Sequence, residues 1–250
     1  MNGSGAKKRL QSSARGATPP IGIESGEQTI ALMREITDTV MLAFSCGKDS
    51  IAAYLAIRDH FPKIVPYYMY LVPGLEFVEE SLRYYEQIIG TKILRIPHPS
   101  LYRWLNCQVF TAPWQASVIE GAGLPDFEYF DIQEAMRQDF GLGPHSYVAT
   151  GVRAADSPIR RMSMMRHGTI SHKTKQFYPV WDWRIARVWD AIKASKIALP
   201  VDYAMFGRSF DGLDYRFLAP IKERFPDDYA RICEWFPLAE AELKRRTIHD

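Results

Sequence analysis

The stretch that decides the expected fold is Val40-Met41-Leu42-Ala43-Phe44-Ser45-Cys46-Gly47-Lys48-Asp49-Ser50. Its first five residues are an uninterrupted apolar run, which is typical of a short β-strand buried on both faces of a sheet. Helical spacing follows over residues 51–57. A buried strand that passes directly into a helix is the repeating unit of a parallel α/β sheet, so this stretch predicts an α/β fold.

The loop between this strand and this helix has the composition of an anion-binding site. Gly47 lets the backbone approach a ligand closely, and Ser50 is placed to cap the helix, whose first N–H groups carry partial positive charge. Ser45 and Ser50 offer hydroxyl donors and Lys48 adds a charge, while Asp49 would orient the loop or help to hold Mg²⁺. A capped turn that binds nothing explains the same composition equally well.

The rest of the chain continues this alternation. Strands are expected at residues 64–72, 92–96, 145–150 and 177–181, and helices at 30–36, 75–89 and 184–197. We therefore expect a mostly parallel sheet with helices on both faces. Ligands of such sheets bind beyond the carboxyl ends of the strands, which singles out the loops after Phe44, Val72 and Thr150. The helix at 184–197 is expected to turn four apolar side chains inward: Ile185, Val188, Trp189 and Ile192.

Three regions are expected along the chain. Residues 1–22 are small, polar and basic, and are expected to form a flexible tail. Residues 23–214 carry the strand and helix alternation, with an insertion of undecided shape at 111–143. Residues 215–250 contain prolines between short helical pieces and predict a small C-terminal helical appendage.

Composition limits the possible classes of function. The chain has 250 residues, of which 47% are hydrophobic and 24% charged, as in ordinary globular proteins. Its 31 basic and 29 acidic residues give a net charge of +2, too even to indicate a surface for a polyanion. A nucleic-acid partner is compatible with the basic tail but is not otherwise indicated. No apolar run suits a membrane span or a signal peptide, so we expect a cytoplasmic protein without a membrane partner.

The cysteines exclude several kinds of site. Cys46, Cys107 and Cys233 are the three in the chain, and no two form a C-x-x-C pair. We therefore expect no zinc site and no iron–sulfur cluster. A sparse, odd number of cysteines also argues against a secreted disulfide framework and favours a reducing compartment.

The six residues Ser45–Ser50 resemble the Ser-Gly-Gly-x-Asp-Ser loop of the PP-loop ATP pyrophosphatases, with Cys46 in place of the first glycine. They do not match a Walker A loop. The resemblance implies a parallel α/β sheet whose loop binds the pyrophosphate part of ATP, or the phosphate part of a related adenylyl nucleotide.

A second loop, Gly151-Val152-Arg153-Ala154-Ala155-Asp156-Ser157-Pro158-Ile159-Arg160-Arg161, follows the strand expected at 145–150. Three arginines beside a glycine at a strand end favour a phosphate or sulfate clamp, because guanidinium groups offer fixed bidentate donors. A solvated basic loop is the alternative. The stretch resembles the Gly-x-Arg-x-x-Glu-Ser-x-x-Arg motif of the phosphoadenosine phosphosulfate (PAPS) reductase branch of that superfamily. The implied nucleotide-binding residues here are Gly151, Arg153, Asp156, Ser157, Arg160 and Arg161.

Three further segments resemble the same branch in the same order. Residues 178–183 with Val188-Trp189 resemble its Pro-Leu-x-Asp-Trp…Val-Trp segment, and residues 199–209 resemble its Leu-Pro…Tyr-x-x-Gly-Tyr-x-Ser stretch. Residues 72–77 lie where the family has a second nucleotide loop, Asp-Thr-Gly-x-x-Phe-Pro-Glu. Of its first three residues only the glycine, Gly74, is present in this chain.

The same resemblance reduces the number of reactions that are expected of this chain. The reductases use a cysteine in a Glu-Cys-Gly-Leu-His tail, and this chain ends without one. The remaining implied chemistry is attack at the α-phosphorus of ATP with Mg²⁺, which adenylylates an unknown acceptor and releases pyrophosphate. Lys48, Asp49 and Arg153 are the implied catalytic residues, with Asp49 also the candidate magnesium ligand.

Two alternatives stay open at this point. The first is a PAPS-handling enzyme that uses an external thiol or a partner protein. The second is a non-catalytic module that binds a nucleotide. The stretch with His167, His172, Lys173 and Lys175 is either a mobile lid that adds positive charge or a plain exposed loop.

Overall fold

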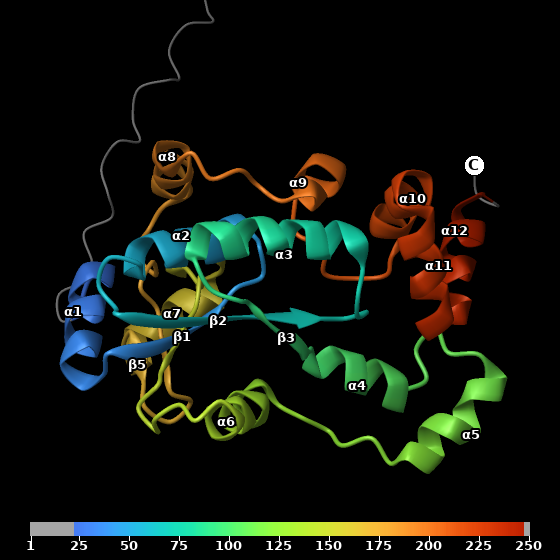
Figure 1. Ribbon diagram of the computed structural model, residues 1–250, viewed down its shortest axis with the longest axis horizontal. Helices are drawn as coiled ribbons and strands as arrows, with labels where there is room; N and C mark the ends of the chain where they lie inside the picture. Colours follow the sequence, from blue (N-terminus) through green and yellow to red (C-terminus); the bar gives the residue numbers. More distant parts are fainter. Residues whose placement is uncertain (1–22, 248–250) are drawn as a thin grey trace, which may run out of the picture.

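The computed structural model describes residues 23–247 and shows a layered α/β architecture (Figure 1). The described part of the chain forms one six-stranded sheet in the order β3-β2-β1-β4-β6-β5. All neighbouring strands run parallel except β5 and β6, which are antiparallel. The mostly parallel α/β fold expected from the sequence is thereby confirmed. The strands are β1 (Thr39–Ala43), β2 (Lys63–Tyr70), β3 (Leu94–Pro97), β4 (Val148–Ala149), β5 (Ile170–Ser171) and β6 (Gln176–Phe177).

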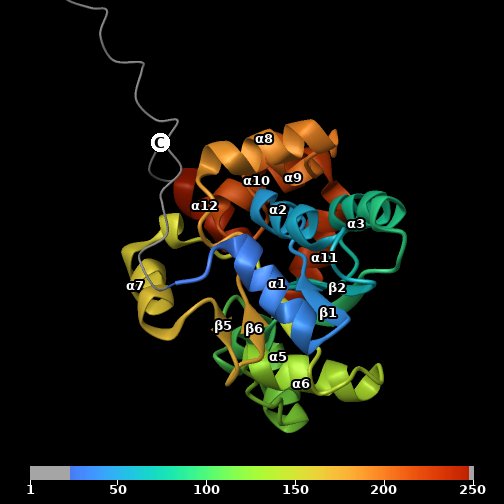
Figure 2. The same cartoon turned by 90° about the vertical axis from the view of Figure 1, so that its left-hand side faces the viewer.

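Helices cover both faces of the sheet (Figures 1 and 2). One face carries α1 (Gly26–Ile36), α2 (Lys48–Ile57), α3 (Glu76–Ile89) and α8 (Ile185–Ser195), with α9 (Val201–Phe206) beyond them. The opposite face carries α4 (Pro99–Asn106) and α6 (Tyr129–Asp139), with α5 (Pro113–Ala122) further out. The short turn η1 (Ala154–Asp156) and α7 (Pro158–His167) lie beside the end of the sheet that carries β5.

The side chains of the central strand β1 show why both faces of the sheet are covered by helices. Val40 and Leu42 belong to the large core cluster shared with α1, α2 and α8. Met41, between them, packs on the other face against Ile132 and Met136 of α6. All three strand residues have no exposed surface. Successive side chains of a strand point to opposite faces, so an all-apolar strand requires apolar layers on both sides.

The C-terminal helices share a core with the sheet domain. They are α10 (Tyr215–Arg224), α11 (Pro226–Trp235), η2 (Pro237–Ala239) and α12 (Glu240–Thr247). Phe217 of α10 and Ile232 of α11 lie in one cluster with Phe77 of α3 and Leu101 of α4. The buried carboxylate of Asp228 also accepts hydrogen bonds from the backbone N–H groups of Glu76 (2.7 Å) and Phe77 (3.1 Å). It thereby caps α3, which lacks a side-chain cap of its own.

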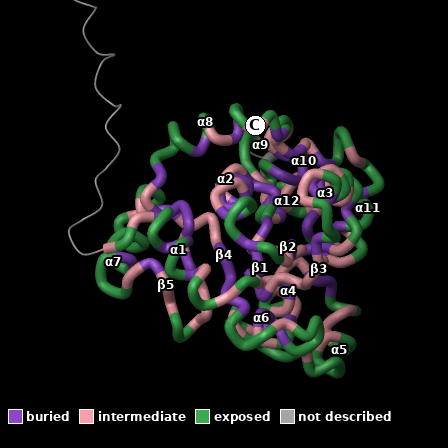
Figure 3. The backbone as a smooth tube through the Cα atoms, turned by 60° about the vertical axis from the view of Figure 1, so that its left-hand side comes forward, coloured by how far each residue is buried: buried purple, intermediate pink, exposed green. Residues whose placement is uncertain are grey.

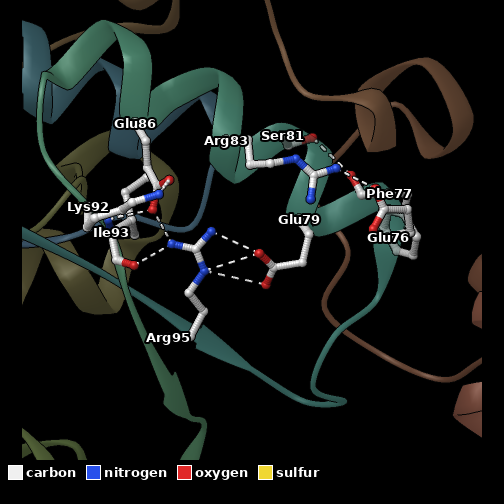
Figure 4. A network of polar contacts seen from close by, with 9 residues as sticks. All are labelled: Glu76, Phe77, Glu79, Ser81, Arg83, Glu86, Lys92, Ile93 and Arg95. Carbon is white, nitrogen blue, oxygen red and sulfur yellow. Dashed lines mark hydrogen bonds and ion pairs between the residues drawn. The ribbon is translucent and has the colours of Figure 1, made fainter.

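An ion-pair network ties α3 to β3 (Figure 4). Arg95 of β3 binds Glu79 and Glu86, which lie two helical turns apart on α3. Burial of Glu86 opposes its ionisation, but hydrogen bonds from Arg95, from the Ile93 N–H and from Lys92 outweigh that effect and lower the pKa of Glu86 to about 2. The network therefore holds a nearly buried carboxylate in its charged form.

Several details differ from expectation. Ile185 and Trp189 are exposed, whereas Val188 and Ile192 are buried as expected. The reason is that α8 packs on α2 along the single stripe that passes through Val188 and Ile192, which is too narrow for all four residues. The fourth strand is only Val148–Ala149, and the insertion at 111–143 forms α5 and α6.

Two further expectations were a flexible N-terminal tail and a chain without a membrane-spanning segment. The tail expected at 1–22 lies outside the described residues. Over residues 23–247, no helix combines the length and apolar character that a membrane span requires.

Candidate functional site

The strand order places the two motif loops on either side of the central strand. From β1 the chain moves outward to β2 and β3, then returns to the other side of β1 as β4. The strand order reverses at this point, and parallel sheets bind ligands in the crevice outside such a reversal. The loop of residues 44–47 leaves β1 here, and the loop of residues 150–157 leaves β4.

Backbone contact joins the two loops directly. A side chain at Gly151 would overlap the carbonyl oxygen of Asp49, and its Cβ would lie 2.9 Å from the backbone nitrogen of Ser50. Only a glycine permits this approach, because any Cβ would occupy the same space as the first turn of α2. The structure thus brings together residues that the sequence placed in two separate motifs about a hundred positions apart.

The turn into α2 differs from the expected capped turn. The N-cap residue is Gly47, not Ser50, and no side chain caps it. The Ser50 hydroxyl donates to the Gly47 carbonyl at 2.8 Å, which braces the turn and places Ser50 inside the helix. Cys46 has a positive φ of 58° and Ser45 is exposed at the mouth of the loop. The prediction that Ser50 caps the helix is therefore wrong, since a glycine holds that position.

Charges at the junction of the loops compensate one another. Lys48 Nζ lies 2.6 Å from Asp49 Oδ2, and Arg153 Nε lies 3.0 Å from Asp49 Oδ1. Arg153 is buried, and its Nη2 also contacts Asp156 Oδ1 at 2.6 Å. The Arg153 Nε and Asp49 Oδ1 atoms are close but not aligned for a hydrogen bond, so this pair is held by charge alone. The implied catalytic set of Lys48, Asp49 and Arg153 is one contiguous cluster.

The remaining arginines of the second loop lie further out. The Ser157 hydroxyl caps α7 by accepting from the Arg160 N–H at 3.2 Å. Arg160 is exposed and reaches Asp156 at 3.4 Å. Arg161 is exposed and, within the described part of the chain, forms no ion pair. Both residues belong to α7, which follows the loop, whereas Arg153 is buried within the loop itself.

Gly74 lies on the loop after β2, at the same edge of the sheet. Its φ is +68°, a conformation that favours glycine. A Cβ at this position would lie 3.5 Å from Nη1 of Arg231, an exposed residue of α11. The C-terminal helices therefore contribute a cation to this edge, which the sequence did not indicate.

Burial governs the chemistry of Cys46. The side chain is buried, and this desolvation raises the pKa of the thiol well above its ordinary value; nearby Asp202 raises it further. A thiol held in its neutral form is a poor nucleophile. Cys46 therefore acts as a small apolar side chain of the core cluster.

Two side chains at the loop were not identified from the sequence as contacts. The Tyr203 hydroxyl accepts the N–H of Lys48, the first residue of α2, at 3.0 Å. The Ser209 hydroxyl lies so near Gly47 that a Cβ there would be 2.5 Å from it. Both belong to the stretch 199–209, whose resemblance to the reductase branch was the available signal. Their distance in sequence from α2 hid the contact.

The stretch with the two histidines is divided between two elements, because His167 is the last residue of α7 whereas His172, Lys173 and Lys175 lie in the hairpin that follows. Residues 170–177 contain β5 and β6, which pair as part of the sheet. Lys175 pairs with Glu134 at 3.1 Å, and His172 Nδ1 lies 2.8 Å from the Tyr147 hydroxyl. The described residues contain no group of three or more histidine, cysteine or acidic side chains that could hold a metal ion.

Comparisons with known proteins add only distant likenesses. No protein-family model and no curated protein sequence matches this chain. One similar solved structure is the NH3-dependent NAD synthetase from Campylobacter jejuni, in complex with a nitrate ion, at 13% identity and a TM-score of 0.43. The likeness covers 89% of this chain and 93% of that one.

A second similar structure is the U34-tRNA thiolase NcsA from Methanococcus maripaludis, with its [4Fe-4S] cluster, also at 13% identity and a TM-score of 0.43. It covers 86% of this chain and 80% of the thiolase. Similarity at this level carries no information about the function of this chain.

Proposed function

We propose that this protein is a nucleotidyltransferase of the PAPS reductase-like branch of the PP-loop ATP pyrophosphatases. It binds ATP at the loop Ser45–Ser50 and transfers the adenylyl group to an acceptor, so that adenylylation accompanies release of pyrophosphate. The bond between the acceptor oxygen and the α-phosphorus forms, the bond from the α-phosphorus to the bridging oxygen breaks, and the acceptor loses its proton to solvent.

One observation carries this proposal. The loops after β1 and β4 meet in backbone contact at the reversal of strand order, where parallel sheets bind their ligands. Hydroxyls, helix N–H groups and at least three cations gather there, which is the donor set that polyphosphates require.

Each residue has a role in this scheme. Ser45, Gly47, Lys48 and Ser50 hold the pyrophosphate, because the first turn of α2 presents its dipole and donors there. Arg153, Arg160 and Arg161 neutralise the charge that develops on the leaving group. Asp49 orients Lys48 and Arg153 by pairing with both. The protein acts by positioning and by charge stabilisation.

The residues present do not form a magnesium site of their own. Asp49 is the one carboxylate of the loop, and each of its oxygens already faces a cation. A magnesium ion that accompanies ATP is therefore part of the substrate, bound mainly through phosphate oxygens. No step proposed here depends on a metal held by the protein.

PAPS is the second candidate ligand. The exposed cations Arg160 and Arg161 of α7 favour a nucleotide with an additional phosphate or sulfate group. None of Cys46, Cys107 and Cys233 lies in a Glu-Cys-Gly-Leu-His sequence, so in this candidate reaction an external thiol or a partner protein acts on PAPS. The sparse cysteines, none in a disulfide among the described residues, support our placement of the protein in the cytoplasm.

Calorimetric titration with ATP, PAPS and adenosine phosphosulfate, with and without Mg²⁺, tests the proposal. We expect ATP with Mg²⁺ to bind most tightly, and mass spectrometry to find the adenylylated acceptor and pyrophosphate when the right acceptor is supplied. Tighter binding of PAPS, lost in Arg153→Ala, would favour the second candidate. Recovery of intact ATP with every acceptor would favour the alternative in which the protein is a non-catalytic module that binds a nucleotide.

The Asp49→Ala variant tests the role of the charge cluster. We expect turnover to fall at least about a hundredfold, because Lys48 and the buried Arg153 lose the anion that orients them. Asp38→Ala is the matched control, since Asp38 forms an exposed ion pair with Arg34 away from the loop. Full activity in Asp49→Ala with ATP would contradict the assignment.

A further inference from the structure

The carboxyl end of β3 lies at the same edge of the sheet as the two motif loops. The His98 N–H donates to the Tyr70 carbonyl at 2.9 Å, which continues the parallel pairing of β3 with β2 just past the end of β3. Strand β2 pairs in turn with β1, which leads into the loop at residues 45–50. Because neighbouring strands lie about 4.8 Å apart, His98 is displaced sideways from the line of β1 by roughly 10 Å. A substrate that extends from the motif loops along this edge therefore meets His98.

His98 is paired with the hydroxyl of Tyr129. Its Nε2 lies 2.9 Å from that hydroxyl, and the two rings meet edge to face with their centroids 5.4 Å apart. The Ser100 N–H donates to His98 Nδ1 at 3.0 Å, so the ring hydrogen is on Nε2. Burial lowers the pKa of His98 and the charge of Arg103 lowers it further, which keeps the ring neutral at pH 7. Nε2 therefore donates and the Tyr129 oxygen accepts.

The proton of the Tyr129 hydroxyl is available to a ligand. Within residues 23–247, the only hydrogen bond of this hydroxyl is the one with His98. The Tyr129 residue is 46% exposed, and Figure 3 shows the chain that leads into α6 largely exposed. A hydroxyl that a neutral histidine fixes on one side, and that is open to solvent on the other, is a preorganised donor.

Arg103 supplies a cation beside this pair. It is an exposed residue of α4 and forms no ion pair with the described part of the chain. Burial raises the pKa of Tyr129, and the charge of Arg103 opposes that rise more strongly than the charge of Glu128 adds to it. Both α4 and α6 begin at the pair, so two helix N-termini add partial positive charge. Such a donor set suits a carboxylate or a phosphate.

We propose that Tyr129 and Arg103 bind an anionic group of the acceptor, a carboxylate or a phosphate. This inference rests on the adenylyl transfer proposed above. The acceptor oxygen that reacts lies at the motif loops, and the anionic group lies at the end of β3, on the order of 10 Å away. The acceptor therefore belongs to the class of molecules that carry a carboxylate or phosphate at that distance from the reacting oxygen. His98 is a positioning residue, because it holds the Tyr129 hydroxyl.

Nuclear magnetic resonance of the full-length chain with ¹³C-labelled histidine tests this site. The signal of His98 is the one that is absent from the His98→Gln variant. Sodium acetate and sodium phosphate are the probes, and each is titrated against sodium chloride at equal ionic strength. We expect a saturable shift of the His98 signal with at least one of them. The anion with the lower half-saturation concentration identifies the group that the acceptor carries.

Two variants remove the donors one at a time. Tyr129→Phe and Arg103→Gln should each raise the half-saturation concentration at least about tenfold, because each removes a hydrogen bond to a charged group. Arg166→Gln is the matched control, since Arg166 is an exposed arginine of α7 and should leave that concentration unchanged. A His98 signal that shifts with neither anion, or equal half-saturation in the parent and both variants, would overturn the site.

The affinity for ATP separates this inference from the proposed function. Calorimetry should find the same ATP affinity in Tyr129→Phe as in the parent, because Tyr129 lies outside the motif loops. Weaker ATP binding in this variant, with an unchanged circular dichroism spectrum, would overturn the assignment of Tyr129 to the acceptor. A parent chain that binds the anion beside His98 but not ATP would refute the nucleotide function and retain the anion site.

Discussion

Single atoms decide whether the two loops can form a site. Gly151 is needed because its Cα lies against the backbone of the first turn of α2, and Gly47 because the Ser209 hydroxyl lies beside it. The sequence identified both glycines as members of motifs. It did not show what each glycine makes room for, because Asp49 and Ser209 are distant along the chain.

The Gly151→Ala variant tests this close approach. A methyl group at this position would overlap the Asp49 carbonyl, so the two loops must separate. We expect a loss of about 1–3 kcal/mol in the free energy of unfolding, together with at least a tenfold weaker binding of ATP. Thermal denaturation and calorimetry measure the two effects.

Gly143→Ala is the matched control for this variant. Its Cβ would meet no atom within 4 Å, and its φ lies outside the positive range. Stability and binding should stay within about 0.5 kcal/mol of the parent protein. Equal effects of the two substitutions would show that the backbone contact at Gly151 is not required.

Among the elements, α3 and β3 depend on charge as well as on apolar packing. The positions of α3 and β3 along the sequence were predictable, because the segment of α3 has the spacing of a helix and the segment of β3 has the pattern of a strand. Their ion-pair network was not, since Arg95 reaches across two turns of α3 to Glu79 and Glu86. The helix pattern indicates which residues lie on one face, but not which side chain of a neighbouring strand meets them.

The acid dependence of stability should show this network. The folded pKa of Glu86 is about 2, below the ordinary value of 4.5. A carboxyl with a depressed folded pKa contributes stability above its unfolded pKa and loses it as pH falls. We expect Glu86→Gln to be less stable than the parent at pH 7 and to lose less stability between pH 4.5 and pH 2.

Urea denaturation over that pH range measures the effect. Glu80→Gln is the control, because Glu80 is exposed on the same helix and forms no ion pair within residues 23–247. Parallel pH profiles for the parent and Glu86→Gln would contradict the assigned role of Glu86.

At the scale of the whole molecule, the C-terminal helices and the sheet form one packed body. The cluster around Phe77, Phe217 and Ile232 spans the expected boundary after residue 214. Asp228 adds a polar link, because its buried carboxylate caps α3 from α11. The sequence predicted these helices, but their description as an appendage leaves out this shared core.

The Asp228→Ala variant tests the link. Two backbone N–H groups of α3 would lose their partner, which should cost about 1–3 kcal/mol. The expected result is a lower thermal midpoint with a single cooperative transition, because the shared apolar cluster remains. Calorimetry measures both features.

The neighbouring residue supplies the control. Asp227 is exposed in the first turn of the same helix, so Asp227→Ala should shift the midpoint by less than about 2 °C. Two separate transitions in Asp228→Ala would indicate that the sheet domain and the C-terminal helices fold independently.

The sequence by itself determined the fold class, because the apolar run Val40–Phe44 passes directly into a helical pattern and this alternation of strand and helix continues along the chain. It also located the two loops, since glycine and charged residues follow strands at identifiable positions. Periodicity failed on α8, where Ile185 and Trp189 face solvent, because a pattern defines a stripe but not the surface against which it packs.

The tertiary structure decided everything that depends on contacts between distant segments. Examples are the contact of Gly151 with Asp49, the Tyr203 hydroxyl on α2, and the capping of α3 by Asp228. Each joins residues more than 100 positions apart. Local propensity carries no information about such contacts, which arise only when a shared core brings the segments together.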